Sequence, residues 1–285
     1  MKSRNYSESE KFAAVERFLV GGESVATIAA DTGISRSTLY AWIKSAQIEP
    51  GMVEFTRKNF RMLEAKVKRL EGIVEIARQH HLIIFSDEIY DRLVMDGGEH
   101  ISIASLAPDL FCVTFSGLSK SHMIAGFRIG WMILSGNKAI AQDYIEGIRM
   151  LSNMRLCSNV PAQSIVQTAL GGYQSVSNYL TPGGRVYEQR ECIYQALKDI
   201  PGLSVVKPKA AFYMFPKLDV KKFHITNDEQ FALDLLRDKK ILLIHGGGFH
   251  WEQPDHFRIV YLPKLEDLEY SMNEMRDFLK DYKQK

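Results

Sequence analysis

The 285-residue chain has little cysteine, little net charge and no long hydrophobic run. Its cysteines, Cys112, Cys157 and Cys192, are odd in number and widely spaced, which argues against a disulfide framework and for reduced thiols in the cytoplasm. A net charge of +2 gives no overall attraction to nucleic acid. No apolar run approaches the roughly 18 residues that cross a bilayer, and the first residues contain no signal-peptide core. We therefore expect a cytoplasmic protein without a membrane partner.

Two other absences exclude specific chemistries. The run His245-Gly-Gly-Gly-Phe249 matches the oxyanion-hole loop of lipases and esterases, but the Gly-x-Ser-x-Gly nucleophile motif of that fold occurs nowhere in the chain. The eight histidines show no metal-ligand spacing, and the adjacent His80 and His81 would point to different faces of a helix. The sequence therefore predicts neither an esterase nor a metal site.

The chain is organised around residues 116–131, a Gly/Ser-rich stretch that contains one lysine and one arginine. Lys120 follows the apolar segment 110–115, which is predicted to be a buried strand. Arg128 comes eight residues later, between two glycines. A second apolar segment, 82–89, is predicted to be another strand and leads into Asp87-Glu-Ile-Tyr90.

Two more motifs complete an ordered set: Ser158-Asn-Val-Pro161, and Arg258 within His256-Phe-Arg-Ile-Val260. In this order and spacing the motifs resemble those of the class I/II aminotransferases, which are pyridoxal 5'-phosphate (PLP) enzymes of fold type I. The alanine (glutamate–pyruvate) transaminase branch is the most similar one. The resemblance runs over about residues 74–285, and any one of the motifs alone would be weak.

The resemblance implies a role for each residue, and the residue types suit PLP chemistry, which needs an amine, an acid and cations. Lys120 would bond the cofactor and act as the base at the substrate Cα, and Asp87 would pair with the pyridine nitrogen. Tyr90 would hydrogen-bond the ring oxygen, and Arg128 would bind the phosphate with the loop residues Ser116 and Ser119. Arg258 would bind the substrate α-carboxylate.

Residues 1–48 do not belong to that pattern. They predict three short helices, at 9–20, from Val25, and at 36–44, with a Gly-containing turn before Ser35 as N-cap. This arrangement is typical of a helix-turn-helix, and it resembles the small DNA-binding protein of insertion-sequence transposases. The residues expected to face outward and contact DNA are Arg36, Ser37, Tyr40 and Lys44. The alternative is a packing unit with a solvated polar face.

Residues 55–72 carry an apolar seam of roughly two heptads at Phe60, Leu63, Val67 and Leu70. The segment is basic, and in the transposase family it corresponds to a dimerising zipper. An amphipathic helix lying on a neighbouring element explains the seam equally well. Near residues 71–75 the two resemblances meet, so one helix from about 55 to 80 is expected. The glycine at position 72 would weaken its middle by about 1 kcal/mol.

The aminotransferase family has a first half that this sequence does not match. That half supplies phosphate-binding amides, an aromatic residue that stacks on the PLP ring, and an Asn-Pro motif whose Asn bonds the ring oxygen. Residues 1–86 contain no Asn-Pro. We therefore expect an α/β fold with a truncated PLP-transferase large domain and a complete α+β small C-terminal domain, preceded by an all-α helix-turn-helix and a zipper-like helix. The expected domains are 1–48, 49–72, 73–182 and 183–285.

Three interpretations of function remain open. The first is a PLP-dependent aminotransferase acting on amino acid and 2-oxo acid substrates, of the alanine/2-oxoglutarate type. It would form a homodimer, would be impaired in catalysis, and would have DNA as a candidate partner through residues 1–72. The second is a DNA-binding protein that carries a non-catalytic aminotransferase remnant. The third is the product of a transposon insertion or of an assembly join, with neither function.

Overall fold

The computed structural model describes residues 6–19, 22–46 and 57–285. Two compact units emerge. The first comprises Met1–Glu88, Gly97–Ser116 and Gly130–Ser158, and the second comprises Ile89–Asp96, Gly117–Ile129 and Asn159–Lys285. The chain thus passes repeatedly between the units, so neither is one continuous stretch. Within the described residues, no helix is both long and apolar enough to cross a bilayer.

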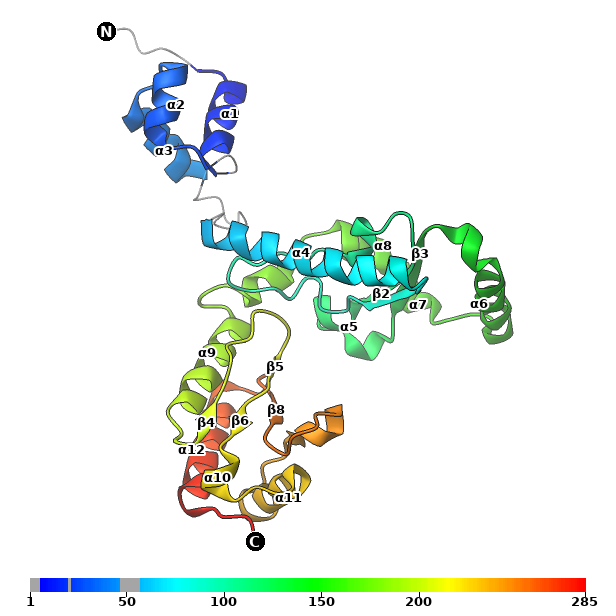
Figure 1. Ribbon diagram of the computed structural model, residues 1–285, viewed down its shortest axis with the longest axis vertical. Coiled ribbons are helices and arrows are strands. Elements are labelled where there is room, and N and C mark those ends of the chain that lie inside the picture. Colours follow the sequence, from blue (N-terminus) through cyan, green and yellow to red (C-terminus); the bar gives the residue numbers. More distant parts are fainter. Residues whose placement is uncertain (1–5, 20–21, 47–56) are drawn as a thin grey trace. The chain divides into compact units, whose positions relative to one another are not determined.

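The first unit begins with three short helices, α1 (Glu8–Leu19), α2 (Val25–Thr32) and α3 (Arg36–Ala46), drawn in blue in Figure 1. The expected helix-turn-helix is confirmed in its elements. Its core is a small apolar cluster, which contains Ala14, Val25, Ile28, Ile34, Leu39 and Ile43. Gly33 ends α2 with a φ of 70°, a left-handed conformation that glycine adopts at low cost. The Ser35 hydroxyl accepts a hydrogen bond from the Thr38 N–H at 3.1 Å, which confirms the predicted cap.

The next helix, α4 (Arg57–Gln79), is continuous across the place where the two resemblances meet, as expected. Its apolar side contributes Leu70, Val74 and Ala77 to a cluster with β1, β2 and the turn between them. The Lys66 ammonium donates a 2.6 Å hydrogen bond to the Glu99 carbonyl in the same unit. Leu70, the last residue of the predicted seam, therefore packs within this chain. The Phe60 side chain lies outside the described part.

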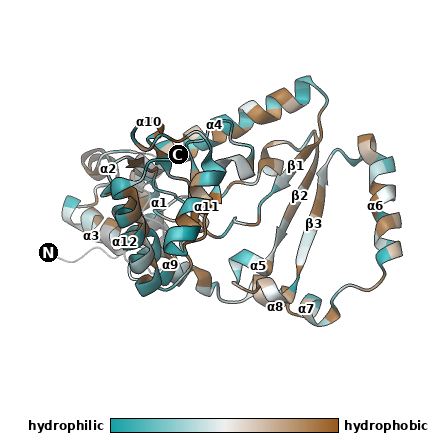
Figure 2. Ribbon diagram, turned by 90° about the horizontal axis from the view of Figure 1, so that it is seen from below, coloured by the Kyte–Doolittle hydropathy of each residue, from teal (hydrophilic) through white to brown (hydrophobic). Residues whose placement is uncertain are grey.

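A three-stranded sheet forms the centre of the first unit, in the order β1 (Ile84–Asp87), β2 (Phe111–Gly117) and β3 (Gly130–Gly136). Figure 2 shows the three strands side by side. β1 and β2 are parallel, with Ile84 opposite Cys112 and Asp87 opposite Phe115. Apolar clusters lie on both faces of β2, so its first residues are almost continuously buried. The turns and helix that accompany the sheet are η1 (Ile103–Leu106), η3 (Lys138–Ala141) and α6 (Gln142–Arg155).

The outer edge of this sheet is exposed at β1. In the described residues β1 pairs with β2 alone, and the side chains of Leu82, Ile83 and Phe85 are 52%, 41% and 54% exposed. The predicted strand 82–89 is shorter in the structure, where the residues paired with β2 are Ile84–Asp87.

The second unit holds Ile89–Asp96 by main-chain and ionic contacts. The Met95 N–H donates to the Lys209 carbonyl at 2.8 Å, and the Ala211 N–H donates to the Leu93 carbonyl at 2.9 Å. Arg190 has no exposed side-chain surface and donates bidentate hydrogen bonds of 2.7 and 2.8 Å to Asp96. The segment that follows β1 is thereby anchored to the core of the second unit.

That core is formed by two long helices, α9 (Arg185–Lys198) and α12 (Leu265–Asp281), together with two small sheets. One sheet has the antiparallel order β5-β8-β7, and the other pairs β4 with β6. The other strands and helices are α5 (Leu118–Ser121), η2 (Ala125–Phe127), α7 (Val160–Ser164), α8 (Val166–Gly171), η4 (Ser175–Tyr179), β4 (Leu203–Ser204), β5 (Tyr213–Met214), β6 (Lys217–Leu218), α10 (Val220–Phe223), α11 (Asp228–Lys239), β7 (Ile244–His245), η5 (Gly246–Phe249) and β8 (Phe257–Val260).

Candidate active site

The candidate lysine lies just after β2. α5 begins directly behind that strand and carries the half-buried Lys120 in its single turn. Two hydrogen bonds hold this turn: Leu118 N–H donates to the Ile129 carbonyl at 3.3 Å, and the buried Ser121 hydroxyl donates to the Gly117 carbonyl at 3.1 Å. The Lys120 ammonium lies 6.0 Å from the ring centroid of Tyr90. The structure therefore brings these two predicted residues together.

Tyr90 contacts the sheet of order β5-β8-β7 in the second unit. Its hydroxyl donates a 2.9 Å hydrogen bond to the hydroxyl of Tyr213 on β5, and the two rings meet edge to face at 5.9 Å. Tyr213 in turn lies under the guanidinium of Arg258 on β8, 4.6 Å from its ring centroid. Lys120, Tyr90 and Arg258 thus belong to one chain of contacts, and Tyr213 links them although the sequence did not single it out.

Arg258 lies between two aromatic rings. The second ring is that of Phe249, whose centroid is 4.1 Å from the guanidinium carbon. The Nε atom of Arg258 is buried and has no hydrogen-bond partner in the described part of the chain. A buried N–H without an acceptor is unfavourable, so this atom is available to a ligand oxygen.

Arg128 is less firmly held. Its side chain is exposed, and Nη1 donates at 2.6 Å to the carbonyl of Ala125, three residues before it. Its backbone has a φ of 54°, a left-handed conformation that costs a non-glycine residue about 1–3 kcal/mol and is found often at functional sites. Asn159 stabilises the loop, because its side-chain amide donates to the Phe127 carbonyl at 2.9 Å.

In the first unit Asp87 ends β1 and Ser116 lies near the carboxyl end of β2, whereas Ser119 belongs to α5 in the second unit. Asp87 is the last residue of β1 and is exposed, whereas the two serines are half-buried. In open α/β sheets, ligands bind beyond the carboxyl ends of parallel strands. The two strand ends therefore have the location and the polar groups expected of a cofactor site.

The neighbouring carboxylate of Glu88 was not predicted. It is buried and accepts hydrogen bonds from Ser86 and Ser102 at 3.0 and 2.9 Å, and His100 lies 2.9 Å away. These contacts fix the chain directly behind Asp87. Glu88 lies inside the Asp87-Glu-Ile-Tyr90 motif, but the motif gave it no role, because two of its partners, His100 and Ser102, come from a later segment.

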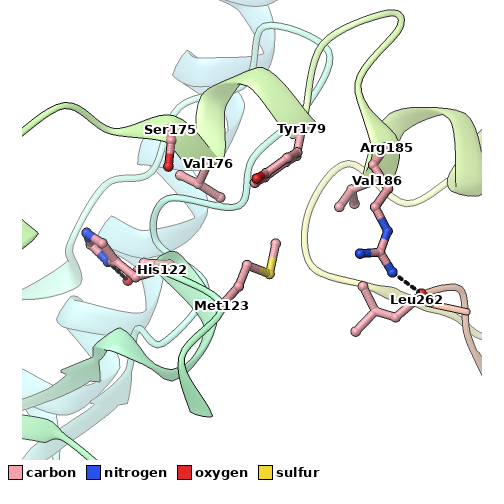
Figure 3. Close-up of a pocket in the computed structure, with 9 residues that line it drawn as sticks. His122, Met123, Ser175, Val176, Tyr179, Arg185, Val186 and Leu262 are labelled. Carbon is pink, nitrogen blue, oxygen red and sulfur yellow. Dashed lines mark hydrogen bonds between the residues drawn. The ribbon is translucent and has the colours of Figure 1, made fainter. Parts of the chain in front are cut away.

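A cavity of about 480 Å³ opens beside the turn that carries Lys120 (Figure 3). It is lined by Ser121, His122, Met123, Ser175, Val176, Tyr179, Arg185, Val186 and Leu262. His122 is already engaged, with Nε2 2.8 Å from the Ala169 carbonyl and Nδ1 2.9 Å from the Ser121 hydroxyl. Arg185 donates to the Leu262 carbonyl at 2.9 Å. Most polar groups of this cavity therefore have partners within the unit.

The candidate DNA contacts lie on α3. Arg36, Ser37 and Tyr40 are exposed, and the Tyr40 side chain has an exposed fraction of 60%. Lys44 belongs to the same helix, but its side chain lies outside the described part. The described residues thus present a polar row on the last helix of the trio.

Comparison with known proteins divides the chain into the same two parts as the sequence resemblances. The family described as "Aminotransferase class I and II" matches residues 64–274, and a family described as "Transposase", of helix-turn-helix type, matches residues 1–81. The overlap of the two matches falls on α4, the helix in which the two sequence resemblances meet.

Several curated relatives are alanine aminotransferases. The chain is 58% identical over 215 residues to the glutamate-pyruvate aminotransferase AlaA of Escherichia coli. The aligned region covers 75% of this chain and 53% of that protein. It is 49% identical over 215 residues to the alanine aminotransferase of Mycobacterium tuberculosis, covering 75% and 50%. The chain thus spans about half the length of the curated relatives it matches.

Solved structures agree with this. A crystal structure of an aminotransferase from Escherichia coli has a TM-score of 0.75 at 57% identity and covers 76% of this chain and 54% of that one. The alanine aminotransferase from Pyrococcus furiosus has a TM-score of 0.69 at 39% identity, covering 75% and 53%. By its fold, by the family that matches most of its length and by the order of its motifs, the chain belongs to the aminotransferase class I and II family of fold-type-I, PLP-dependent enzymes.

Proposed function

We propose that the chain is the core of a PLP-dependent transaminase that binds the cofactor at Lys120 and the substrate carboxylate at Arg258. By similarity to the curated relatives, the substrates are alanine and 2-oxoglutarate. The observation that carries the proposal is the buried, unpartnered Nε of Arg258, half of a guanidinium fork between two aromatic rings. A guanidinium fork matches the two oxygens of a carboxylate.

The residues present fit the cofactor. Lys120 has the amine that attaches to it, and Tyr90, with its ring 6.0 Å from that amine, has a phenol for the ring oxygen. Asp87 would hold a proton on the pyridine nitrogen, and Arg128 with Ser116 and Ser119 would bind the phosphate. When bound, PLP supplies an electron sink for the bond that breaks at the substrate Cα.

The residues of the chain then have separate tasks. Arg258 orients the substrate by its carboxylate and turns the Cα–H bond toward the lysine. Lys120 Nζ would accept the proton from the substrate Cα as a general base. Tyr90 donates a hydrogen bond to Tyr213 and so fixes its own ring beside Lys120.

We expect turnover to be weak. Arg128 and Asp87 have exposed side chains, so water competes for the groups that should bind the phosphate and the pyridine nitrogen. Electrostatic stabilisation is strongest in a water-excluded, preorganised site, and each lost contact typically costs about 10²–10³ in rate. A misplacement of about 1 Å costs on the order of a hundredfold more.

The test combines a spectrum with an assay. Adding PLP to the full chain should produce a visible absorbance band that disappears in Lys120→Ala. A coupled pyruvate assay with alanine and 2-oxoglutarate should give at most a small fraction of the rate of the Escherichia coli relative. No band at high PLP would contradict cofactor binding, and a rate close to that of the relative would contradict the weak-turnover part.

A second function is favoured by the exposed row of Arg36, Ser37 and Tyr40 on α3 and by the transposase match. We propose that residues 1–72, with 12 Lys and Arg and 9 Asp and Glu, bind DNA modestly as a dimer. Affinity should fall with salt at a log–log slope of about −0.9 per phosphate contact. Arg36→Ala should reduce discrimination between sequences, and fluorescence anisotropy without binding at low salt would contradict the proposal.

Two further expectations belong with these proposals. We expect a cytoplasmic location, where the thiols of Cys112, Cys157 and Cys192 would stay reduced. A homodimer is the expected assembly of the aminotransferase part, and light scattering combined with size-exclusion chromatography tests it.

A further inference from the structure

The guanidinium of Arg258 is held by ring faces. Its carbon lies 4.6 Å from the centroid of Tyr213 and 4.1 Å from that of Phe249, and its Nε has no hydrogen-bond partner in the described part of the chain. We call Tyr213 and Phe249 the aromatic bracket. Ring faces attract a cation but leave the N–H groups at its edge without acceptors. The bracket can therefore fix the plane of the fork while its N–H donors remain available to an anion.

The strand pairing makes this arrangement rigid. Tyr213 on β5 is opposite Val260 on β8, and Arg258 is two residues from Val260 on the same face of the strand. This diagonal neighbour position brings long side chains within reach of each other. The neighbours of Tyr213 in sequence, Phe212 and Met214, are buried in the core, so Tyr213 points to the opposite side, toward the candidate site.

The other ring of the bracket has support of its own. Phe249 closes the short turn η5 and meets Phe215 edge to face at 6.3 Å. Phe215 also stacks on His256 at 4.8 Å. One ring thus comes from β5 and the other from the turn after β7, the two strands that flank β8, and both contact the same guanidinium.

Tyr213 has a second contact that Phe249 lacks. Its hydroxyl accepts the 2.9 Å hydrogen bond from the Tyr90 hydroxyl, and the Tyr90 ring lies 6.0 Å from the Lys120 ammonium. One side chain therefore touches the carboxylate-binding arginine with its ring and the residue beside the reactive lysine with its hydroxyl.

We propose that Tyr213 is a positioning residue with two separable roles: its ring orients Arg258 for a carboxylate, and its hydroxyl couples that orientation to Tyr90 beside Lys120. The inference rests on the proposed function and adds to it a residue that acts through others. Tyr213 contacts neither reacting atom, and its effect is transmitted through Arg258 and Tyr90.

Three substitutions separate the two roles. Tyr213→Phe keeps the ring and removes the hydroxyl, Tyr213→Leu removes both, and Phe249→Leu removes the other ring of the bracket. Tyr270→Leu is the control, because Tyr270 is an exposed tyrosine on α12 that belongs to neither ring of the bracket. Arg258→Ala shows that any signal comes from this site.

The experiment titrates each full-length variant with succinate by calorimetry and records the visible spectrum with PLP as a function of pH. Tyr213→Leu and Phe249→Leu should each weaken succinate binding by about tenfold, the loss of one ring face from a desolvated cation. Tyr213→Phe should leave succinate binding within about twofold, but it should move the pH midpoint of the PLP band, because the Tyr90 hydroxyl has lost its acceptor. Tyr270→Leu should change neither.

Several outcomes would overturn the inference. Succinate binding of normal strength in both leucine variants would show that the rings do not position Arg258, and an unchanged midpoint in Tyr213→Phe would remove the coupling role. If Tyr213→Leu fails to fold, Phe249→Leu and Tyr213→Phe still decide both roles. A PLP band that depends on Lys120, with no succinate binding by the unsubstituted chain, would overturn this inference and leave cofactor binding intact. Absence of the band would instead contradict the proposed function.

Discussion

The two ends of the candidate site are supported very differently. Arg258 lies in a β-sheet whose core includes the buried Phe257, Ile259 and Tyr261, and its guanidinium lies over the rings of Tyr213 and Phe249. Arg128 has an exposed side chain on a loop and bonds only to a carbonyl three residues before it among the contacts described. Both arginines suit an anionic group, but only Arg258 is preorganised by neighbouring elements. The same residue type therefore differs in expected affinity according to what surrounds it.

The difference extends to the sheets. In the second unit the strands β5, β8 and β7 lie against a large apolar core that includes α9 and α12. In the first unit, β1 is at the edge of its sheet and carries exposed apolar side chains. A sequence that favours a strand is thus not sufficient to shield the strand from pairing with other chains, because shielding depends on which element pairs beside it.

The largest expected effect comes from disrupting the anchor that holds Ile89–Asp96 to the well-packed unit. Asp96→Ala leaves the fully buried Arg190 guanidinium without its bidentate partner. Removal of one partner from a fully buried pair costs about 3–5 kcal/mol, but Asp96 is partly exposed and Glu191 remains 2.9 Å from Arg190. The free energy of unfolding, measured by urea titration followed by tryptophan fluorescence, should therefore fall by about 2–3 kcal/mol.

The matched control is Arg237→Ala, whose ion pair with Asp234 is exposed and 3.9 Å long. That change should stay within about 0.5 kcal/mol. Equal losses in the two variants would show that burial of Arg190 does not set the strength of the anchor.

The second prediction concerns the exposed edge. Because β1 has an open edge and an apolar flank, the full chain should associate or aggregate in a concentration-dependent way. Ile83→Lys should reduce this association in light scattering, since a charge at an edge disfavours pairing with another chain. Ile140→Lys, at an exposed apolar position outside the strands, should have little effect. A monodisperse monomer with one cooperative melt, before any substitution, would contradict the prediction.

The third prediction uses acid to weaken the same anchor. Burial alone would raise the pKa of Asp96, but the bidentate Arg190 guanidinium outweighs it and holds the pKa below its ordinary value. Since the folded-state pKa is lower than that of the unfolded chain, the stabilisation is present above about pH 4 and is lost as pH falls through the folded-state value.

A series of urea titrations between pH 6 and pH 3 measures this effect. The unsubstituted chain should lose more stability across that range than Asp96→Asn does. Parallel losses in the two proteins would show that the acid sensitivity comes from other groups.

The smallest effects are expected at the helix caps. Asn227 caps α11 in the second unit and Ser35 caps α3 in the first, with side-chain oxygens that accept hydrogen bonds of 3.0 and 3.1 Å. Substitution of either by Ala should cost about 0.5–2 kcal/mol. The loss should appear in the unfolding of the helix that each one caps, so hydrogen exchange resolved by segment can assign it. A loss spread over both units would contradict a local role.

Much of the fold could be predicted because its signals are local. Ser35 was predicted as a cap, and it accepts the hydrogen bond expected of one. The continuity of α4 was predicted because the helices of the two resemblances meet near residues 71–75, with a single glycine at the join. Where the signal was not local the boundaries shifted: a strand over 82–89 was expected, whereas β1 spans Ile84–Asp87.

The candidate site divides in the same way. Lys120, Arg128 and Arg258 were predicted from motifs, and the chemistry of each follows from its residue type. Tyr213 was not, because its importance comes from a strand register and from the distant Tyr90. Sequence periodicity marks which residues face a core, but it does not indicate which two segments will meet.

The sequence by itself determined the helices and their caps, the order of the motifs, the family and the residue types available for chemistry, because these depend on neighbours along the chain. Only the tertiary structure decided that Arg258 lies between Tyr213 and Phe249, that Asp96 is bound by the buried Arg190, and that Arg128 remains exposed. These outcomes depend on the pairing of strands and on the burial of side chains from segments far apart in sequence. Burial removes the water that would otherwise compete for a charge, and it is a property of the assembled fold.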